Sequence, residues 1–437
     1  MNGRAPGPIA PHKHLSHSLK RAVYGATTLD ARVDSWLEGA RGSLGAALRE
    51  SAWYRLLPER RIRVSPFVER PGRDVGPLAG RRVLVLALVP PEDTGGGSRP
   101  AQLAAELHRR GCTIDWRWAL PIFPWPKRLR PQVAGLHVRH VSESPLPGEA
   151  ERADRPADLA LLEAPHPALL ALATADGAAR RIAYDAIDLW DGVLGAGWWR
   201  DDAEAEAIAR ADLLLASARL LRDELERRSG RPATLLPNAV DLRLFDPGPS
   251  REIPADLRRG RPTIGYVGAL WGTWVDLDLV AAVAARLPEA VIDLVGPVGD
   301  RRLPVAANIA ALGPKPQFEV PAYLRAIDVA IVPFAPGRLT AAVSPLKAFE
   351  YLAMHKPVVA TPLPDLEGVP GVHLADGAEG FAAAITRAVR EPFPTAEVDA
   401  FLARHTWSAR IDELCRLAGL GPSGGPGRLD ADASVRA

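Results

Sequence analysis

Short apolar runs recur along the chain and alternate with stretches in which apolar residues return every three or four positions. A near-continuous run such as residues 83–89 (VLVLALV) is typical of a parallel strand covered on both faces. Helical periodicity between such runs indicates crossover helices, which build parallel sheets. The pattern therefore predicts an α/β fold, with strands at 83–89, 159–163, 181–185, 213–217, 263–267, 291–295, 308–312, 328–333 and 357–360.

Residues 246–262 separate two groups of these runs, because they are rich in Pro, Arg and Gly and show no apolar period. We expect them to be a linker between an N-terminal domain at 79–245 and a C-terminal domain at 263–395. The pattern predicts a further helix at 396–418 and a disordered Gly/Ser/Asp-rich tail at 419–437.

Residues 1–78 precede the first predicted strand and contain one amphipathic helix pattern that begins near Leu29. The polar face of this helix carries both signs of charge, which favours packing on the body of the protein over membrane binding. Membrane binding remains an open alternative for this segment.

The composition and charge of the chain mainly exclude certain classes of partner and site. Of 437 residues, 47% are hydrophobic and the formal net charge is only +2, so nothing indicates a nucleic-acid partner. Cys112 and Cys415 form no disulfide framework or metal motif, and no apolar run approaches the roughly 18 to 20 residues that span a bilayer. We expect a cytoplasmic protein, with association at the inner face of the membrane left open and the oligomeric state undetermined.

The stretch 344–361 combines a helix start with a buried strand. Ser344 can cap the helix, and Pro345 suits its first position. Lys347 and Glu350 then share one face near the amino end, where the helix dipole and free N–H groups favour phosphate. Glu350 could accept paired sugar hydroxyls, so the pattern fits a nucleotide, although a weak surface Lys–Glu pair explains the spacing equally well.

Other candidates follow predicted strands in the N-terminal domain. Gly96 and Gly97 leave a bare backbone before a helix that opens at Ser98 or Arg99, in a sequence that is neither a P-loop nor a dinucleotide fingerprint. His166 lies at a strand end, where it is a general base or a structural cap. Downstream, Asp276 and Asp278 form an Asp-x-Asp pattern, for which helix capping is the favoured explanation over metal binding.

These stretches resemble the donor-site signature of nucleotide-sugar glycosyltransferases with two Rossmann domains (GT-B), in particular a bacterial subgroup related to retaining family four, of the teichuronic acid and exopolysaccharide type. Five ordered stretches carry the resemblance: SPLKAFEYLAMHKPVVATPLP, LLPNAVDLRLF, PTIGYVGALWGTWVDLDLV, NIAALGPKP and PAYLRAIDVAIVPF. The resemblance implies that the last helix crosses back to the first domain. It also implies that Asp185 and Asp188 line the cleft wall, although both could be turn or cap aspartates.

The chain departs from the family pattern at several positions. The basic pair after Gly268 is missing, and Ala342 replaces the first of two glutamates. Arg338 or backbone N–H groups at 341–344 could substitute for that glutamate. Asn238 is followed by Ala239 where the family has glycine, so Asn238 is the residue that could adopt a positive φ. His355 replaces a glycine at the end of a helix and could adopt left-handed geometry.

We therefore predict a metal-independent glycosyltransferase that needs no cofactor, uses a nucleotide-sugar donor and acts on a glycan, lipid-linked or small-molecule acceptor. The resemblance implies that it retains the anomeric configuration. The alternatives are a nucleotide-sugar epimerase of the same fold and a non-catalytic nucleotide-sugar-binding protein. The predicted catalytic residues are Glu350, Lys347, Asp185 and His166. The predicted donor site comprises Gly268, Arg338, Ser344, Pro345, Lys347, Glu350 and Asn238, and the acceptor side comprises Gly96, Gly97, Asp188 and Trp190.

Overall fold

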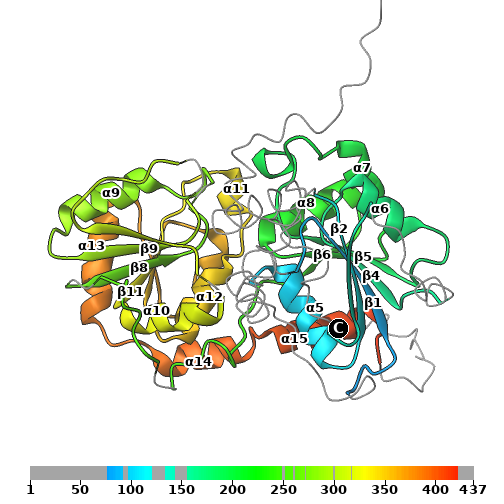
Figure 1. The fold of residues 1–437 in the computed structure, drawn as a ribbon. Coiled ribbons are helices and arrows are strands. Elements are labelled where there is room, and N and C mark those ends of the chain that lie inside the picture. Colours follow the sequence, from blue (N-terminus) through cyan, green and yellow to red (C-terminus); the bar gives the residue numbers. More distant parts are fainter. Residues whose placement is uncertain are drawn as a thin grey trace, which may run out of the picture.

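The structure is a computed structural model that describes residues 76–91, 97–120, 133–142, 155–248, 251–258, 261–270, 272–298, 301–315 and 317–421. Two α/β units lie side by side, each built on its own parallel sheet (Figure 1). The predicted amphipathic helix near Leu29, Gly96 and most of the predicted tail lie outside the described residues.

Within the described residues, seven strands form the sheet of the first unit, in the order β3-β2-β1-β4-β5-β6-β7. The order reverses direction at β1 and β4, which makes the carboxyl edge there a switch point of the kind that binds ligands. The strands are β1 (Arg82–Ala87), β2 (Thr113–Trp118), β3 (Leu136–His140), β4 (Leu159–Leu162), β5 (Ile182–Ala186), β6 (Leu213–Ala216) and β7 (Thr234–Leu235). The helical segments are α5 (Arg99–Arg109), α6 (Pro167–Thr174), η4 (Val193–Gly195), α7 (Asp201–Arg210) and α8 (Arg219–Ser229).

The second unit has a sheet of six strands in the part of the chain that is described, in the order β10-β9-β8-β11-β12-β13. They are β8 (Thr263–Val267), β9 (Val291–Val295), β10 (Ile309–Gly313), β11 (Val329–Val332), β12 (Val358–Ala360) and β13 (Val372–Leu374). The helical segments are α9 (Leu277–Arg286), η5 (Gln317–Glu319), α10 (Val320–Ala326), α11 (Arg338–Ala341), α12 (Leu346–Ala353), η6 (Pro364–Leu366) and α13 (Gly377–Arg390).

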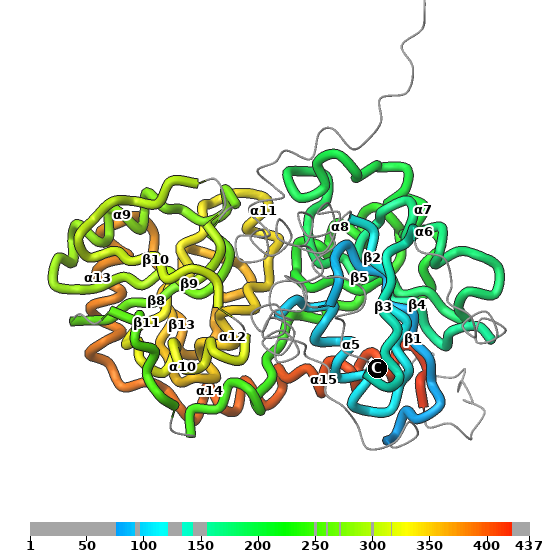
Figure 2. The backbone as a smooth tube through the Cα atoms, viewed as in Figure 1, coloured from blue at the N-terminus to red at the C-terminus, as the bar shows by residue number. Residues whose placement is uncertain are grey.

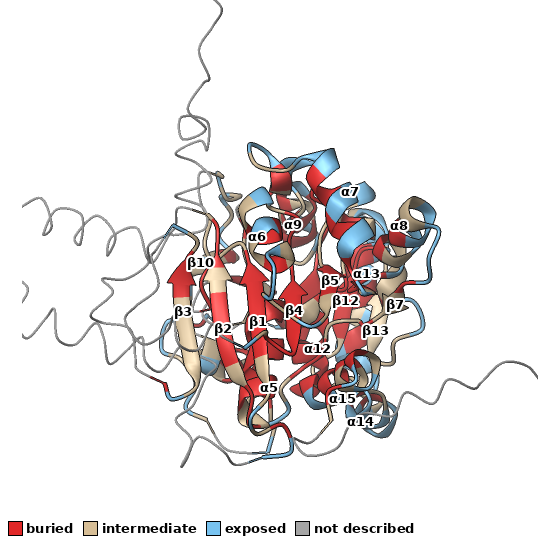
Figure 3. Cartoon of the chain, turned by 90° about the vertical axis from the view of Figure 1, so that its right-hand side faces the viewer, coloured by how far each residue is buried: buried red, intermediate tan, exposed pale blue. Residues whose placement is uncertain are grey.

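Both sheets are covered on two faces, as the apolar runs predicted. β1 and β4 are buried almost throughout, whereas the outer faces of α7 and α8 are exposed (Figure 3). The central strand β11 of the second sheet is likewise buried. The strands at the nine predicted ranges are confirmed within a few residues. β2 and β3 were not predicted, although Trp116 and Trp118 of β2 are fully buried in the first core.

The predicted single helix at 396–418 is wrong, because the chain forms two helices there, α14 (Thr395–Ala403) and α15 (Trp407–Ala418). The break has a local cause: the Thr406 hydroxyl accepts a hydrogen bond from the Ala409 N–H and starts a new helix. α14 packs on α12 in the second unit, whereas α15 packs on α5 in the first. Figure 2 shows the chain passing from the orange α14 to the red α15 across the two units.

The chain crosses between the units twice, and the two crossings are bonded to each other. Val240, at the start of the first crossing, donates its N–H to the His405 carbonyl at 3.0 Å and forms a parallel bridge with Thr406. In the portions of the chain that the structure describes, no helix is long and apolar enough to cross a membrane.

Candidate active site

The α12 helix begins one residue later than predicted. Pro345 precedes the first turn with a non-helical ψ of 97°, so α12 starts at Leu346 and Ser344 does not cap it. Ser344 is buried and instead faces Asn238 of the first unit: its Oγ accepts from the Asn238 N–H at 3.3 Å, and its carbonyl accepts from the Asn238 side-chain amide at 2.7 Å. Ser344 therefore joins the two units beside the start of α12.

Lys347 lies between the carboxyl ends of β8 and β11. Its Nζ is 4.8 Å from the ring centroid of Phe334 and 5.5 Å from that of Tyr266, within reach of cation–π attraction. Gly268 follows β8 with φ 151°, and a Cβ placed there would lie 2.8 Å from Lys347 Cε. The glycine thus keeps the bare backbone open beside the ammonium group, an arrangement that suits an approaching phosphate.

Glu350 lies one turn further along α12 and is buried. Gln317 of η5 donates its side-chain amide to Glu350 Oε1 at 3.2 Å, and Gln102 of α5 donates to the Gln317 amide oxygen at 3.2 Å. A chain of hydrogen bonds therefore connects the first unit to this carboxylate. Gln317 was missed by the sequence reading because no spacing signal links a residue after β10 to α12.

Burial shifts the charge states of Lys347 and Glu350 toward neutrality. Desolvation raises the pKa of Glu350 to about 7, opposed by the Gln317 hydrogen bond and by the positive charge of Lys347. Desolvation likewise lowers the pKa of Lys347 to about 8, opposed by the Glu350 charge. Both groups therefore titrate near physiological pH, which is common at functional sites.

Asp185 lies inside the first unit and is fully buried. Arg99, the first residue of α5, contacts it with two hydrogen bonds, Nε to Oδ2 at 2.8 Å and Nη2 to Oδ1 at 3.0 Å. A third guanidinium N–H of Arg99 reaches Asn238 Oδ1 at 3.3 Å. Asp185 is thus enclosed by Arg99, and its direct effect is to orient Arg99 toward the turn that holds Ser344. The position of Arg99 two residues after a run of three glycines was the signal that could have identified it.

Asn238 has no positive φ, contrary to the expectation for this turn; among the described non-glycine residues only His355 does, at 54°. The prediction for His355 is therefore confirmed. Asn238 instead contacts Ser344 through both its backbone N–H and its side-chain amide.

The carboxyl of Glu163 lies beyond the end of β4 and beside the Arg99–Asp185 pair. Its side chain is buried, and neither oxygen has a clear hydrogen-bond partner in the described part of the chain. Burial and the neighbouring negative charge of Asp185 raise its pKa well above the usual range. The folded protein therefore favours the protonated form of Glu163.

The residues expected to replace the missing first glutamate face the first unit. Ala342 is fully buried and packs against the first-unit core, and the backbone N–H groups of Ala341, Ala342 and Val343 donate within α11 and its final turn. Arg338 Nη1 forms an ion pair with Asp191 Oδ2 at 2.6 Å. Arg338 and the N–H groups of Ala341, Ala342 and Val343 are therefore already engaged within the protein.

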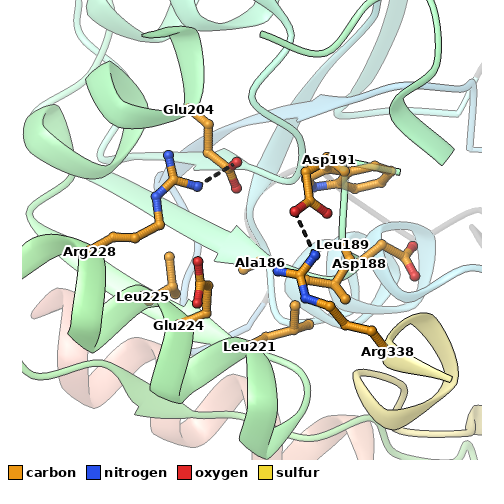
Figure 4. Close-up of a pocket in the computed structure, with 11 residues that line it drawn as sticks. Ala186, Asp188, Leu189, Asp191, Glu204, Leu221, Glu224, Leu225, Arg228 and Arg338 are labelled. Atoms are coloured by element: carbon orange, nitrogen blue, oxygen red, sulfur yellow. Dashed lines mark hydrogen bonds and ion pairs between the residues drawn. The ribbon is translucent and has the colours of Figure 1, made fainter. Parts of the chain in front are cut away.

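Asp188 and Trp190 line a pocket in the loop after β5, together with residues of α7 and α8 and with Arg338 (Figure 4). Burial raises the pKa of Asp188 to about 7. The indole N–H of Trp190 is buried and has no partner among the described atoms.

His166 has the structural role that the sequence left open. It precedes α6, and its Nδ1 accepts a hydrogen bond from the Ala168 N–H at 3.2 Å. Burial lowers the pKa of His166 to about 4, so the ring is neutral with its proton on Nε2. This tautomer can donate but cannot accept a proton at Nε2, which argues against the predicted role as a general base.

Two further predicted positions have plain structural explanations. Gly97 lies directly before Ser98, which precedes the first turn of α5 without a side-chain cap. Asp276 caps α9 by accepting from the Leu279 N–H at 2.8 Å, as favoured over metal binding. The geometry therefore brings Gly268, Lys347 and Glu350 together, links Asp185 to Asn238 and Ser344, and separates Arg338, Asp188 and Trp190 into a second region.

Two parallel-sheet α/β units joined by a linker and a returning C-terminal helix define the GT-B architecture. Solved structures share it: sucrose-phosphate synthase from Thermosynechococcus elongatus is 16% identical with a TM-score of 0.57, covering 77% of this chain and 98% of that one. Anabaena Alr3699/HepE in complex with UDP and glucose is 16% identical with a TM-score of 0.55, covering 76% and 99%. At these identities the likeness shows the fold.

Residues 261–391 match the family described as "Glycosyl transferases group 1". The chain is also 30% identical over 221 residues to the putative teichuronic acid biosynthesis glycosyltransferase TuaH of Bacillus subtilis. That alignment covers 46% of this chain and 55% of the relative, so it spans about half of each. The predicted resemblance to GT-B glycosyltransferases of the teichuronic acid type is confirmed by these similarities.

Proposed function

We propose that this protein is a glycosyltransferase that transfers a sugar from a nucleotide-sugar donor to a hydroxyl-bearing acceptor in the synthesis of a cell-surface polysaccharide or glycoconjugate. The observation that carries the proposal is the grouping of Gly268, Lys347 and Glu350 at the start of α12. A bare turn and an ammonium group suit a diphosphate, and a buried carboxylate one helical turn deeper suits the two hydroxyls of a ribose. The match of residues 261–391 to a glycosyltransferase family supports it.

In the proposed reaction the sugar leaves the diphosphate while Lys347 and the amino end of α12 stabilise the charge that develops on the departing oxygen. Such preorganised groups form the main electrostatic contribution to catalysis. Because Lys347 and the partial positive charge at the amino end of α12 can neutralise the leaving group, we propose that neither a metal ion nor a further cofactor takes part. Retention of the anomeric configuration is proposed from the resemblance to retaining family four, and NMR of the first product formed tests it.

A non-catalytic nucleotide-sugar-binding protein is the second candidate, and the burial of Ala342 favours it. The position that carries a donor-contacting glutamate in the family pattern here packs into the first-unit core. This candidate predicts nucleotide binding without release of nucleoside diphosphate in the presence of any acceptor.

Thermal unfolding with a panel of nucleoside diphosphates and nucleotide sugars tests the donor site. A ligand at a hundred times its dissociation constant adds about 2.7 kcal/mol to the free energy of unfolding, which shifts the melting temperature by several degrees. We expect a shift for one base in the wild type, a clearly smaller shift in Glu350→Gln and an unchanged shift in Glu391→Gln, a matched change on the exposed surface of the same unit. Equal shifts in all three proteins would refute the site.

A further inference from the structure

The α5 helix carries a buried polar stripe, which consists of Arg99, Gln102 and Glu106. The three residues follow the i, i+3, i+7 spacing of one helix face, and all are buried. α5 lies on the side of the first unit that faces the second (Figure 1). Glu106 pairs with Arg243, in the first crossing between the units, at 3.2 Å. Buried polar side chains are costly unless they are hydrogen-bonded, so the partners of the stripe indicate what it does.

Gln102 is the member of this stripe that reaches the second unit directly. Its side-chain amide donates to Gln317 Oε1 at 3.2 Å, whereas Arg99 reaches the second unit only through Asn238. Gln317 in turn donates to Glu350 Oε1 at 3.2 Å. Two hydrogen bonds therefore connect a helix of the first unit to the carboxylate of the proposed donor site.

The chemistry of these three side chains fixes the orientation of both amides. An ionised carboxylate only accepts hydrogen bonds, so Gln317 must present its NH₂ group to Glu350. The amide oxygen of Gln317 then faces α5, where it needs a donor, and the NH₂ group of Gln102 supplies one. Without Gln102, the Gln317 amide loses the hydrogen bond that selects this orientation.

The arrangement leaves one oxygen of Glu350 for a ligand. Among the described residues, Gln317 bonds to Oε1 and no residue bonds to Oε2. Desolvation raises the pKa of Glu350 to about 7, against the Gln317 hydrogen bond and the charge of Lys347, which favour the ionised form. Gln317 therefore holds the carboxylate in one orientation and helps to keep it able to accept hydroxyl hydrogens.

We propose that Gln102 is a positioning residue for donor binding: by holding the Gln317 amide, it orients Glu350 of the other unit toward the two hydroxyls of a ribose. The inference rests on the proposed donor site. Gln102 acts through Gln317 and does not touch the nucleotide. The affinity of the second unit for a ribonucleotide therefore depends on α5 of the first unit.

Isothermal titration calorimetry on the full chain tests this role with a pair of ligands. UDP, ADP, GDP and CDP are compared, and the tightest is paired with its 2′,3′-dideoxy analogue, which keeps the base and diphosphate but lacks both hydroxyls. Gln102→Met keeps the length of the buried side chain and removes the amide. It should weaken ribonucleotide binding about 3- to 10-fold, as for one hydrogen bond, and binding of the analogue by less than about twofold. A purely structural defect would weaken both equally.

Three further variants sharpen the test. Gln317→Met should give the same difference between the ligands, and adding Gln102→Met should cause no further loss, because both act on one carboxylate. Gln102→Asn withdraws the amide by one methylene, should give the same difference, and keeps the test available if Gln102→Met does not fold. Arg219→Met is the control, because it removes a different contact between the units, the 3.0 Å bond from Arg219 to the Pro364 carbonyl. It should leave both affinities within about twofold.

Several outcomes would overturn the role of Gln102 alone. They are equal losses for the two ligands in Gln102→Met, unchanged binding of the ribonucleotide, a further loss in the double variant, or the same difference between the ligands in Arg219→Met. Failure of the proposed function would look different, because the wild type itself would bind none of the four nucleotides, or would bind the dideoxy analogue as tightly as the ribonucleotide.

Discussion

Burial, rather than pairing, sets the charge state of the proposed donor-site residues. The pKa of Glu350 is about 7 and that of Lys347 about 8, in both cases chiefly because the side chain is removed from water. A ribose hydroxyl donates to an ionised Glu350, which forms above pH 7, and a diphosphate needs the protonated Lys347, which persists below pH 8. Both conditions hold together only in a narrow range.

The affinity for a nucleotide sugar should therefore rise as the pH passes through 7 and fall as it passes 8. A nucleotide sugar is the suitable probe because its diphosphate does not titrate in this range. Isothermal titration calorimetry between pH 6 and 9 measures the profile. Glu350→Gln should flatten the acidic limb and Lys347→Met the basic limb, each weakening binding about 10- to 100-fold, as expected for one charge-assisted hydrogen bond. A flat profile in the wild type would contradict these assignments.

Glu163 gives a second prediction at the same scale. Its folded-state pKa lies above that of the unfolded chain, so the folded state binds more protons and stability falls as the pH rises above the unfolded value of about 4.5. Glu163→Gln removes this dependence while keeping the shape of the side chain. The melting temperature of Glu163→Gln relative to wild type should therefore be higher at pH 8 than at pH 5, whereas Glu163→Ala, which leaves a cavity, should melt lower at both.

Single residues were predictable from sequence where a local spacing fixed their neighbours. Lys347 and Glu350 share a helical face, and the structure places them within electrostatic reach of each other. The Arg99–Asp185 pair joins residues 86 positions apart, and the Gln317–Glu350 bond joins residues 33 apart. Contacts of this kind depend on which strands are neighbours, which periodicity alone does not specify.

At the scale of elements, the ends of the strands determine what can approach the start of α12. Gly268 directly follows β8 and Gly313 ends β10, both with positive φ. A Cβ at Gly268 would meet Lys347 and the Tyr266 hydroxyl, whereas a Cβ at Gly313 would meet nothing within 4 Å. Substitutions at these two glycines therefore distinguish the cost of backbone strain alone from the additional disturbance of the proposed donor site.

Gly313→Ala should lower the free energy of unfolding by about 1 kcal/mol, because it strains only the backbone. Gly268→Ala should cost more, about 2 to 3 kcal/mol, because Lys347 must also move, and it should weaken nucleotide binding while Gly313→Ala does not. Urea unfolding and calorimetry check both quantities. Equal nucleotide affinity in the two variants would show that the Gly268 turn does not adjoin the donor.

The helices and strands were predictable where apolar runs were continuous. The starts and ends of helices were less predictable where capping residues and the apolar period gave different indications. The sequence predicted Pro345 as the first residue of the helix. The preceding residue, Ser344, is hydrogen-bonded to Asn238, and α12 starts one residue later than predicted. The break between α14 and α15 was missed because apolar periodicity continues through it. The Thr406 cap and the bond from Val240 to His405, rather than any change of period, make the break.

At the scale of the whole molecule, α15 belongs to the core of the first unit although it is the last helix described. Trp407, Ile411 and Leu414 are buried there, beside residues of β1 and α5. Ile411→Ala should therefore destabilise the first unit by about 2 to 5 kcal/mol. The control Glu413→Ala, at a half-exposed position of the same helix, should change stability by less than about 0.5 kcal/mol. Hydrogen exchange can assign the loss: protection should fall in β1 and β4 and persist in β8 and β11.

The return of the chain to the first unit through His405 and Thr406 also affects the order in which the two units can fold during synthesis. A ribosome releases residues 82–235, which form the whole first sheet, long before it releases the helix that closes one side of that sheet. The second sheet and its helices are complete in sequence by residue 403, so the unit encoded later can finish folding first. Until α15 is synthesised, part of the apolar surface of the nascent first sheet stays uncovered. A stalled chain that ends before Trp407 should therefore bind chaperones more strongly than the full chain.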